Sequence, residues 1–272
     1  MPEEVLQKTE KKGITYFFLP QWEACGLVGH GFSSRRGGVS RAPCDELNLG
    51  YKGGDRPQDV VENRRRFLSI WKKKKQDLFY GEQVHANKVL LVDEKMWPAG
   101  YGELLAADAL ITREPGVVLG AFAADCLLIY FLDPQTPALG LAHAGWRGTM
   151  QGIAPGVVQA MQNNFATRVE ALQVLMAPAI QPPCYEVGAA VLQAAAASGW
   201  KTDLVFWPGK RRSHPHFNLP ETNKNMLCRL GIKKENIFSS NYCTHCNPDL
   251  FYSYRRSGGK MTGSQMGIIF LR

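Results

Sequence analysis

Three apolar runs, each short enough to form one buried strand, end beside residues that can bind a metal ion. Short runs bounded by Gly, Pro and Asp are typical of buried β-strands. Functional side chains gather on loops that such a rigid frame holds in place. The runs span Leu78 to Val84, Gly116 to Ala124 and Ala138 to Ala142, and the candidate ligands at their ends are His85, Cys126 and His143. The sequence therefore predicts a β-rich fold in which the ends of distant strands converge.

Further strand-like and helix-like runs predict an α+β fold. They alternate only in places, which favours layered mixed β-sheets flanked by helices over a regular doubly wound sheet. No internal repeat or long linker divides the chain, so we expect one domain over residues 1–272. The expected strands are Gly26 to Phe32, Leu78 to Val84, Lys88 to Val92, Val117 to Phe122, Leu127 to Leu132, Ala138 to Ala142, Leu172 to Met176, Leu204 to Phe206 and Met266 to Leu271. The expected helices are Gln58 to Lys75, Arg147 to Phe165, Glu186 to Ala197 and Glu221 to Leu230.

Composition indicates a soluble protein of a reducing compartment. With 45% apolar residues in 272, the chain can bury a large core. Its start lacks the layout of a signal peptide, and its longest apolar run, Val117 to Leu132, contains Asp125 and is too short to span a bilayer. The seven cysteines are an odd number, and they are scattered over a long chain without the density of a disulfide scaffold, which is typical of a reducing compartment. We therefore expect a cytoplasmic protein without membrane contact, and the oligomeric state stays open.

The net charge of +8 admits an anionic partner, but much of the excess falls in one expected helix. Arg64 to Arg66 and Lys72 to Lys75 belong to it, with Asp55 as its expected cap and Pro57 in its first turn. No aromatic residues interleave with these charges as a binder of single-stranded nucleic acid would need. A solvated helix face is therefore favoured over nucleic-acid binding.

Two imidazoles and one thiol form a zinc site with a fourth position left open for chemistry. Taken singly, a Cys after an apolar run is usually a small core residue and a lone His is usually a satisfied imidazole. Because His85, Cys126 and His143 all lie at the ends of expected strands, the sequence favours the interpretation that they form one ligand set. Their separations far exceed the spacings of about two to five residues in compact metal fingers. A structural zinc site is therefore disfavoured.

Segments beside these residues suit an anionic or heterocyclic ligand. Trp146 and Arg147 follow His143 at an expected helix start, where free amide hydrogens, a stacking ring and a guanidinium can hold a phosphate and a base. A core Trp and a surface Arg are the alternative. A Gly-Gly turn after Arg35 precedes Asn48 and can cradle phosphate, although such a loop is more often only a turn.

Near the C-terminus an aromatic and arginine cluster that includes Arg255 suits a base and phosphate pocket, and a buried structural cluster is the alternative. The preceding Cys243 and Cys246 form a Cys-x-x-Cys pair, which is typical of half a zinc ribbon or of a redox pair. No second such pair exists and no thioredoxin-like helix start follows. Neither interpretation of the pair is favoured.

Together these segments resemble the laccase-domain family, whose members are described as polyphenol oxidases and as purine nucleoside phosphorylases with adenosine deaminase activity. The resemblance extends from Phe32 to Leu271. The segments that carry it are Gln83-Val84-His85, Ala107-Asp108-Ala109 with Thr112, Ala124-Asp125-Cys126, His143-Ala-Gly-Trp-Arg-Gly148, Cys184-Tyr-Glu-Val-Gly188 and Ser253-Tyr-Arg-Arg256. It implies that His85, Cys126 and His143 bind zinc and are needed for activity, and it matches Arg35 to the arginine before the Gly-Gly turn. It also implies a fold like that of the cytotoxic necrotizing factor catalytic domain.

The function implied by the resemblance is zinc-dependent phosphorolysis of adenosine, inosine and methylthioadenosine, together with deamination of adenosine. The partners are then purine nucleosides and phosphate, with Arg35, Asn48, Trp146, Arg147 and Arg255 as the candidate binding residues. Zinc deaminases also use a carboxylate as proton shuttle, for which Asp125 and Glu186 are candidates. Asp125 serves equally well as the cap of a turn.

Three alternatives stay open. A His2Cys set also suits copper and a polyphenol oxidase, although six histidines are too few for a multicopper cluster. A metal-free hydrolase would use Cys126 as nucleophile and His143 as base, which leaves His85 without an essential role. The charge alone motivates a nucleic-acid or partner-binding module, but charge is evidence about association rather than about function.

Overall fold

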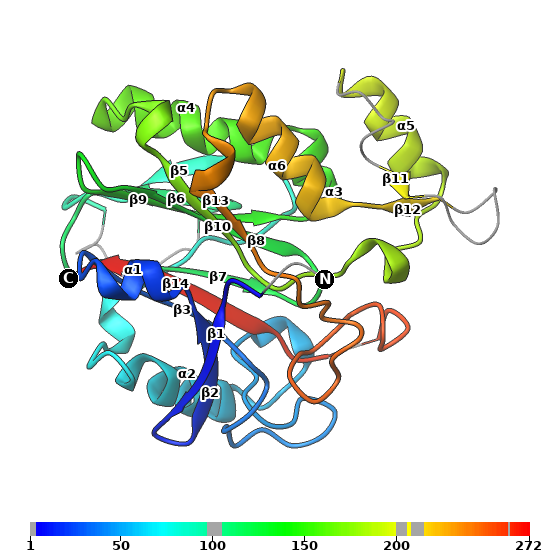
Figure 1. Cartoon of the computed structure of the whole chain (residues 1–272). Coiled ribbons are helices and arrows are strands. Elements are labelled where there is room, and N and C mark those ends of the chain that lie inside the picture. Colours follow the sequence, from blue (N-terminus) through cyan, green and yellow to red (C-terminus); the bar gives the residue numbers. More distant parts are fainter. Residues whose placement is uncertain (1–3, 97–104, 200–205, 208–214, 261) are drawn as a thin grey trace.

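Two six-stranded β-sheets lie face to face at the centre of the molecule, with helices on both outer sides (Figure 1). The computed structural model describes residues 4–96, 105–199, 206–207, 215–260 and 262–272. The first sheet has the order β1-β2-β3-β14-β7-β4, and the second has the order β13-β10-β8-β9-β6-β5. Both contain parallel and antiparallel pairs. The expected α+β class with mixed sheets is confirmed, and the likeness to the cytotoxic necrotizing factor domain stays a prediction.

The strands of each sheet come from distant parts of the chain. The first sheet comprises β1 (Gln7–Lys11), β2 (Ile14–Phe18), β3 (Val28–Ser33), β14 (Gln265–Leu271), β7 (Val118–Ala123) and β4 (Leu78–Phe79). The second comprises β13 (Ile237–Ser239), β10 (Gln173–Met176), β8 (Leu127–Asp133), β9 (Ala138–Ala144), β6 (Ala109–Thr112) and β5 (Val89–Leu91). A small antiparallel pair, β11 (Phe206–Trp207) and β12 (His216–Phe217), lies apart from both.

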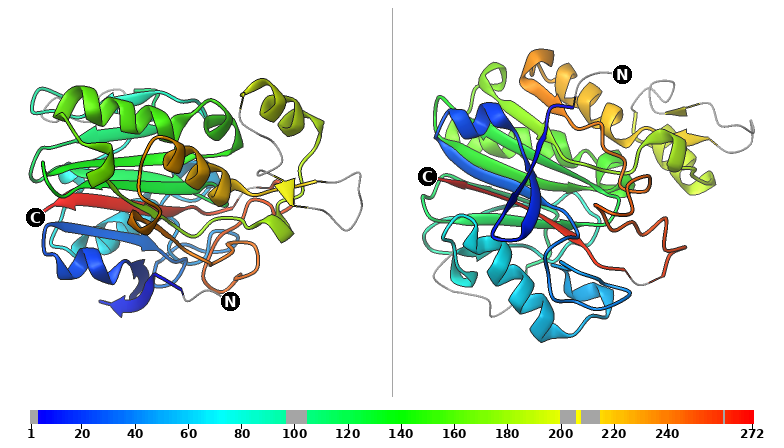
Figure 2. Two further views of the ribbon diagram at one scale, coloured as in Figure 1. Left: turned by 45° about the horizontal axis from the view of Figure 1, so that its top comes forward. Right: turned by 60° about the horizontal axis from the view of Figure 1, so that its bottom comes forward.

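Helices complete a four-layer arrangement, which the two further views of Figure 2 also show. The outer face of the second sheet carries α3 (Trp146–Met150), α4 (Ile153–Phe165) and α6 (Leu219–Arg229), whereas α2 (Pro57–Ser69) covers the first sheet. The remaining helices are α1 (Pro20–Ala24), α5 (Ala189–Ala197) and the 3-10 turns η1 (Tyr51–Gly53), η2 (Lys75–Asp77), η3 (Val169–Ala171), η4 (Pro182–Cys184) and η6 (Lys234–Asn236).

The central strands are apolar along their whole length because both of their faces are buried. In β8, Leu128 and Tyr130 face the core between the sheets, and Ile129 and Phe131 face the core under the helices. Successive side chains of a strand point to opposite faces, so one strand serves two cores. A third core, which includes Phe67, lies between the first sheet and α2. The rigid sheets therefore hold their strand ends in fixed positions.

Several element boundaries differ from those expected. The run from Leu78 gives only the two-residue β4, and the helix expected from Arg147 is two helices, because Gly152 adopts φ 79° between them. The expected strand at Leu204 to Phe206 lies largely outside the described residues, which begin again at Phe206. Strands β1, β2, β6, β12 and β13 and helix α1 were not expected.

The basic helix α2 is only partly a solvated face. It begins at Pro57, one residue before the expected start, with this proline in its first turn as expected. It ends at Ser69 rather than Lys75, and Asp55 does not cap it because Arg56 takes the cap position. Arg64 is buried, donates to the Leu49 carbonyl at 2.8 Å and packs over three aromatic rings. Part of the positive charge of α2 is thus buried, where it contributes to packing rather than to a charged surface. Among the described residues no helix is long and apolar enough to cross a membrane.

Candidate metal centre

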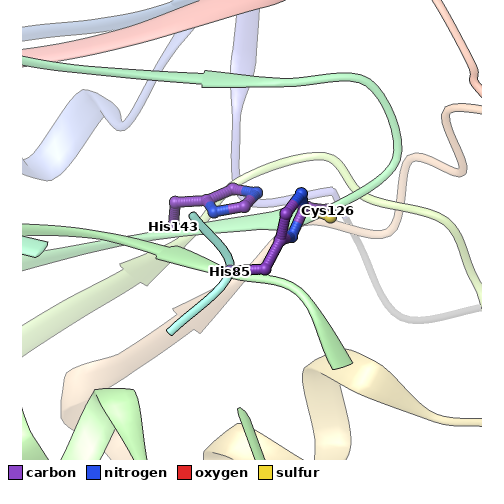
Figure 3. Close-up of side chains that lie close together, drawn as sticks. All are labelled: His85, Cys126 and His143. Atoms are coloured by element: carbon purple, nitrogen blue, oxygen red, sulfur yellow. The ribbon is translucent and has the colours of Figure 1, made fainter. Parts of the chain in front are cut away.

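The pairing of β8 with β9 brings Cys126 and His143 together. The two strands are antiparallel with Leu128 opposite His143, so the residue before β8 lies beside the end of β9. His85 joins them from the loop between β4 and β5. The candidate ligand atoms of all three residues lie within 4.8 Å of one another, and Figure 3 shows the side chains converging from three separate segments. The expected convergence of His85, Cys126 and His143 is present.

Asp108 connects the two histidines. It precedes β6, which pairs with β9 so that the His143 amide donates to the Asp108 carbonyl at 2.7 Å. Its side chain bonds to His143 Nδ1 at 2.9 Å and accepts the backbone N–H groups of Val84, His85 and Ala86. Burial alone raises the pKa of Asp108, but these bonds lower it, so the carboxylate stays ionised. An ionised carboxylate only accepts, so His143 Nδ1 donates and its Nε2 is left for a metal.

His85 lies in a turn rather than directly after a strand. Its φ is 60°, in the left-handed region that few non-glycine residues adopt. Gln83 holds this turn against β7, because its amide donates to the Phe122 carbonyl and accepts the Phe122 N–H, both at 2.8 Å. His85 is exposed, whereas Cys126 is half-buried and His143 is buried. The group therefore has one side open to solvent.

Electrostatics favour a charged pair at Cys126 and His143. Burial alone raises the pKa of Cys126, but the charge of His143 and hydrogen bonds from both imidazoles lower it to about 6. Burial alone lowers the pKa of His143, but the charge of Cys126 and the bond to Asp108 raise it. In this pair the Nε2 of His143 carries a proton, which it would lose as a metal ion binds. A thiolate and two imidazole nitrogens are then a donor set that suits zinc.

The residues present fit a metal ion with three protein ligands. One soft sulfur and two ring nitrogens match zinc, and a supporting carboxylate orients the buried histidine as in many zinc sites. Gly145 leaves room beside them. A β-carbon there would lie 3.0 Å from His85 Nδ1 and 3.1 Å from Cys126 Sγ. Any larger residue at position 145 would therefore press against two of the three candidate ligands.

Three expected binding residues lie on segments around this centre. Trp146 begins α3 just after β9 ends at Ala144, and it packs against the core. The exposed Arg147 stacks over the ring of Trp146 at 4.2 Å. Arg255 is also exposed, donates to the Cys184 carbonyl at 3.3 Å and lies over the ring of Tyr185 at 5.3 Å. An anion in solvent can therefore reach both guanidinium groups.

Arg35 and Asn48 occupy a separate hydrogen-bonded cluster. Arg35 donates to the carbonyls of Asp45 and Pro248 and lies over the ring of Tyr252. Asn48 is fully buried, donates to Asp55 and accepts the Ser264 N–H. No hydrogen bond among the described residues joins either one to the three ligands. Their role as phosphate ligands stays a prediction, and their contacts hold the loop together.

The two candidate proton shuttles differ in their surroundings. Asp125 is buried with φ 94°, and its carboxylate accepts the Thr244 and Ser253 hydroxyls and the Arg255 N–H. It therefore fastens the turn before Cys126. Glu186 is exposed, and its backbone pairs with His216. Its carboxylate is the more accessible of the two.

Sequence reasoning assigned no role to Asp108 and Tyr185, although both lie in the segments that carry the family resemblance. An Asp enclosed by Ala and Leu is the signal that marks Asp108, because a buried carboxylate needs partners. Burial above all, and then the charge of Cys126, raises the pKa of Tyr185, while Arg255 and Arg147 oppose the shift. Its phenol therefore stays protonated in the neighbourhood of Cys126 and both arginines.

The mixed-sheet fold and the His-Cys-His group define a class of protein with an open, cysteine-containing candidate metal centre. Residues 29–272 match the family described as multi-copper polyphenol oxidoreductase laccase, and the chain belongs to this family. The resemblance seen in the sequence is confirmed.

Similar proteins carry names from purine metabolism. "Purine nucleoside phosphorylase YlmD" of Bacillus subtilis is 32% identical over 89% of this chain and 88% of its own length. "Adenosine deaminase RL5", from an unknown prokaryotic organism, is 33% identical over 84% of this chain and 88% of its own. The crystal structure of YlmD from Geobacillus stearothermophilus matches with a TM-score of 0.90 at 31% identity, over 99% of this chain and 100% of that one.

Proposed function

We propose that the chain, as one domain over residues 1–272, is a metal-dependent purine nucleoside enzyme. It cleaves adenosine, inosine and methylthioadenosine with phosphate to give the free base and ribose 1-phosphate or methylthioribose 1-phosphate, and it deaminates adenosine to inosine. The observation that carries the proposal is the convergence of His85, Cys126 and His143 within 4.8 Å. The names of the relatives supply the substrate class.

The three ligands would hold zinc, and copper is the alternative metal for the same donors. When bound, the metal supplies Lewis-acid chemistry at its open position. The protein's own part is to place the donors and to keep Cys126 as a thiolate, so that only the Nε2 proton of His143 must leave when the metal binds. Asp108 holds the proton of His143 at Nδ1, and the bonds of its carboxylate to the turn fix His85.

The residues around the open side are proposed to contact the substrates. The exposed guanidinium groups of Arg147 and Arg255 suit phosphate, because arginine matches phosphate oxygens with paired donors. The protonated phenol of Tyr185 suits a hydrogen bond to the purine or the ribose, and the Trp146 ring suits stacking. Glu186 is the residue proposed to move the proton in deamination. Arg35 and Asn48 support the adjoining loop.

Purified protein incubated with adenosine tests the proposal. With phosphate we expect adenine and ribose 1-phosphate, and without phosphate we expect inosine alone. Cys126→Ser should lose both activities, whereas Cys25→Ser, which changes an exposed cysteine elsewhere, should keep them. If the wild-type protein gives none of these products, the proposal is wrong.

One observation favours a second candidate, a metal-free Cys-His hydrolase. The lowered pKa of Cys126 beside His143 also suits a nucleophilic thiolate. The metal enzyme needs His85 for activity, whereas the hydrolase does not. Full activity in His85→Ala, together with full activity of the wild type in the presence of a chelator, would support the hydrolase. Loss of activity in the variant and in the chelator-treated wild type would support the metal enzyme. Oxygen uptake on a phenol, with copper in the isolated protein, would instead support an oxidase.

A further inference from the structure

Three other cysteines form a second sulfur cluster outside the His-Cys-His group. The sulfur atoms of Cys184, Cys243 and Cys246 all lie within 4.8 Å of one another, and those of Cys184 and Cys246 are 3.2 Å apart. Cys184 ends the short turn η4, and the other two follow β13. The Cys-x-x-Cys pair of the sequence thus gains a third cysteine that lies far away in the chain.

The backbone around Cys243 holds its sulfur in place. Cys243 pairs with Ala179 in a short β-bridge, and the Thr244 N–H donates to the Ala179 carbonyl at 3.1 Å. The Gln181 N–H donates to Cys243 Sγ at 3.4 Å, and the Cys246 N–H donates to the same sulfur. Backbone donors that point at a sulfur stabilise its thiolate form, which is the form that binds metals.

The thiols of Cys184 and Cys243 do not ionise easily without a cation. Burial first, and then the neighbouring thiols, raises the pKa of Cys184 to about 12, and burial also raises the pKa of Cys243. Three thiolates around one point repel one another unless a positive charge lies between them. A bound cation would therefore remove the cost that keeps these thiols protonated.

A disulfide accounts for this arrangement less well than a metal ion does. A disulfide joins two sulfurs and would leave the third unused at the same place. Soft sulfur ligands favour zinc over hard ions such as magnesium and calcium, and a pair two residues apart is the spacing of many zinc sites.

We propose that Cys184, Cys243 and Cys246 bind a second zinc ion through three thiolates. Each thiol loses its proton to solvent as its sulfur binds the ion. Cys246 is exposed, so the fourth position faces water. The site ties two segments that are distant in the sequence, and its role is structural.

The proposed ion would stabilise the surroundings of the first metal centre. The Cys184 carbonyl accepts from Arg255, and the Thr244 hydroxyl donates to Asp125 at 2.6 Å, next to Cys126 in the chain. Both segments that carry the cysteines therefore also contact the rim of the candidate active site. Loss of the ion should loosen the segments that contact Asp125 and Arg255, while His85, Cys126 and His143 stay available as ligands.

Metal analysis of protein purified under reducing conditions tests the proposal. We expect two zinc equivalents in the wild type, one in Cys246→Ser and one in His85→Ala, with two retained in the control Cys25→Ser. A wild type without zinc, or with one equivalent that Cys246→Ser keeps, would overturn the proposal. One equivalent lost in Cys246→Ser but kept in His85→Ala would support it and refute the metal at the first site.

Thiol labelling of the wild type gives a test that does not depend on any variant. We expect Cys184, Cys243 and Cys246 to resist alkylation in the native protein and to react after a chelator is added. The exposed Cys25 should react in both states. Rapid labelling of Cys246 before chelation, or recovery of a disulfide between Cys184 and Cys246 from the reduced preparation, would contradict the proposal.

Discussion

Gly145 is a single residue that leaves space beside the candidate metal centre. Its φ of −74° is accessible to any residue, so the reason for glycine is space rather than backbone conformation. The position of its missing β-carbon lies against two of the three candidate ligands. The site thus depends on the lack of a side chain at position 145 as well as on the side chains of the candidate ligands.

Gly145→Ala should weaken metal binding while the fold is kept. The added methyl group would meet His85 and Cys126, and we expect the metal affinity to fall at least about tenfold, or about 1.4 kcal/mol. Titration of metal-depleted protein with zinc measures the change. Gly156→Ala is the matched control, because its β-carbon would make only ordinary contacts. Equal affinities in the two variants would refute this use of Gly145.

The charge state of Cys126 predicts a pH dependence in metal-free protein. Because the pKa of Cys126 is lowered to about 6, the thiolate persists down to that pH, and alkylation of Cys126 should slow only as the pH falls through about 6. In His143→Ala the midpoint should move up toward the ordinary cysteine value of about 8.5. Alkylation rates measured by mass spectrometry across this pH range test the shift, and identical midpoints in both proteins would contradict it.

At the scale of elements, register places the ligands. Antiparallel pairing places the first residues of β8 beside the last residues of β9. The pairing of β6 with β9 places Asp108, the residue before β6, against His143. The order of the strands thus turns three distant sequence positions into one site. The loop of His85 has only the short bridge between Glu82 and Ala106, and it relies on the side chains of Asp108 and Gln83.

Gln83→Leu should loosen this loop. The change removes two hydrogen bonds to Phe122 and should cost about 1 to 3 kcal/mol of folding stability. Because His85 loses its support, metal affinity should fall as well. Chemical denaturation and zinc titration measure the two effects. The exposed Gln159→Leu on α4 is the control, and a Gln83 variant that matched it in both measurements would refute the role of Gln83.

The apolar runs predicted the central strands well because burial on both faces leaves a clear pattern. Strand β14, for example, differs from the expected strand by one residue. The pattern was missing where burial is incomplete, as in the mostly exposed β1, which the turn at Lys12 and Gly13 connects to β2. The convergence of His85, Cys126 and His143 was predictable from their placement at strand ends. The support by Asp108 was not, because it depends on register between strands.

At the scale of the whole molecule, three separate cores stabilise the fold independently of the first metal centre. The site lies at strand ends, where rigid sheets meet a solvent-facing loop. Part of the net charge is internal, as at Arg64, and other arginines pair with carboxylates, as Arg65 and Arg66 do with Glu62. Surface charge alone is therefore a weak guide to the partner.

Removal of metal should abolish activity and leave the fold in place. By mass action, a metal ion at a hundred times its dissociation constant adds about 2.7 kcal/mol to stability, which is less than the net stability of about 5 to 15 kcal/mol typical of native proteins. We expect the chelated protein to keep its circular dichroism spectrum and to unfold at a lower temperature. Zinc should restore activity. Complete unfolding on chelation would contradict a fold held by its cores.

The most direct test of the central claim is a product assay with His85→Ala beside the wild type. Both proteins are incubated with adenosine and phosphate, and adenine, ribose 1-phosphate and inosine are followed by chromatography. We expect these products from the wild type and their loss from His85→Ala. No product from the wild type, or undiminished product from His85→Ala, would contradict it.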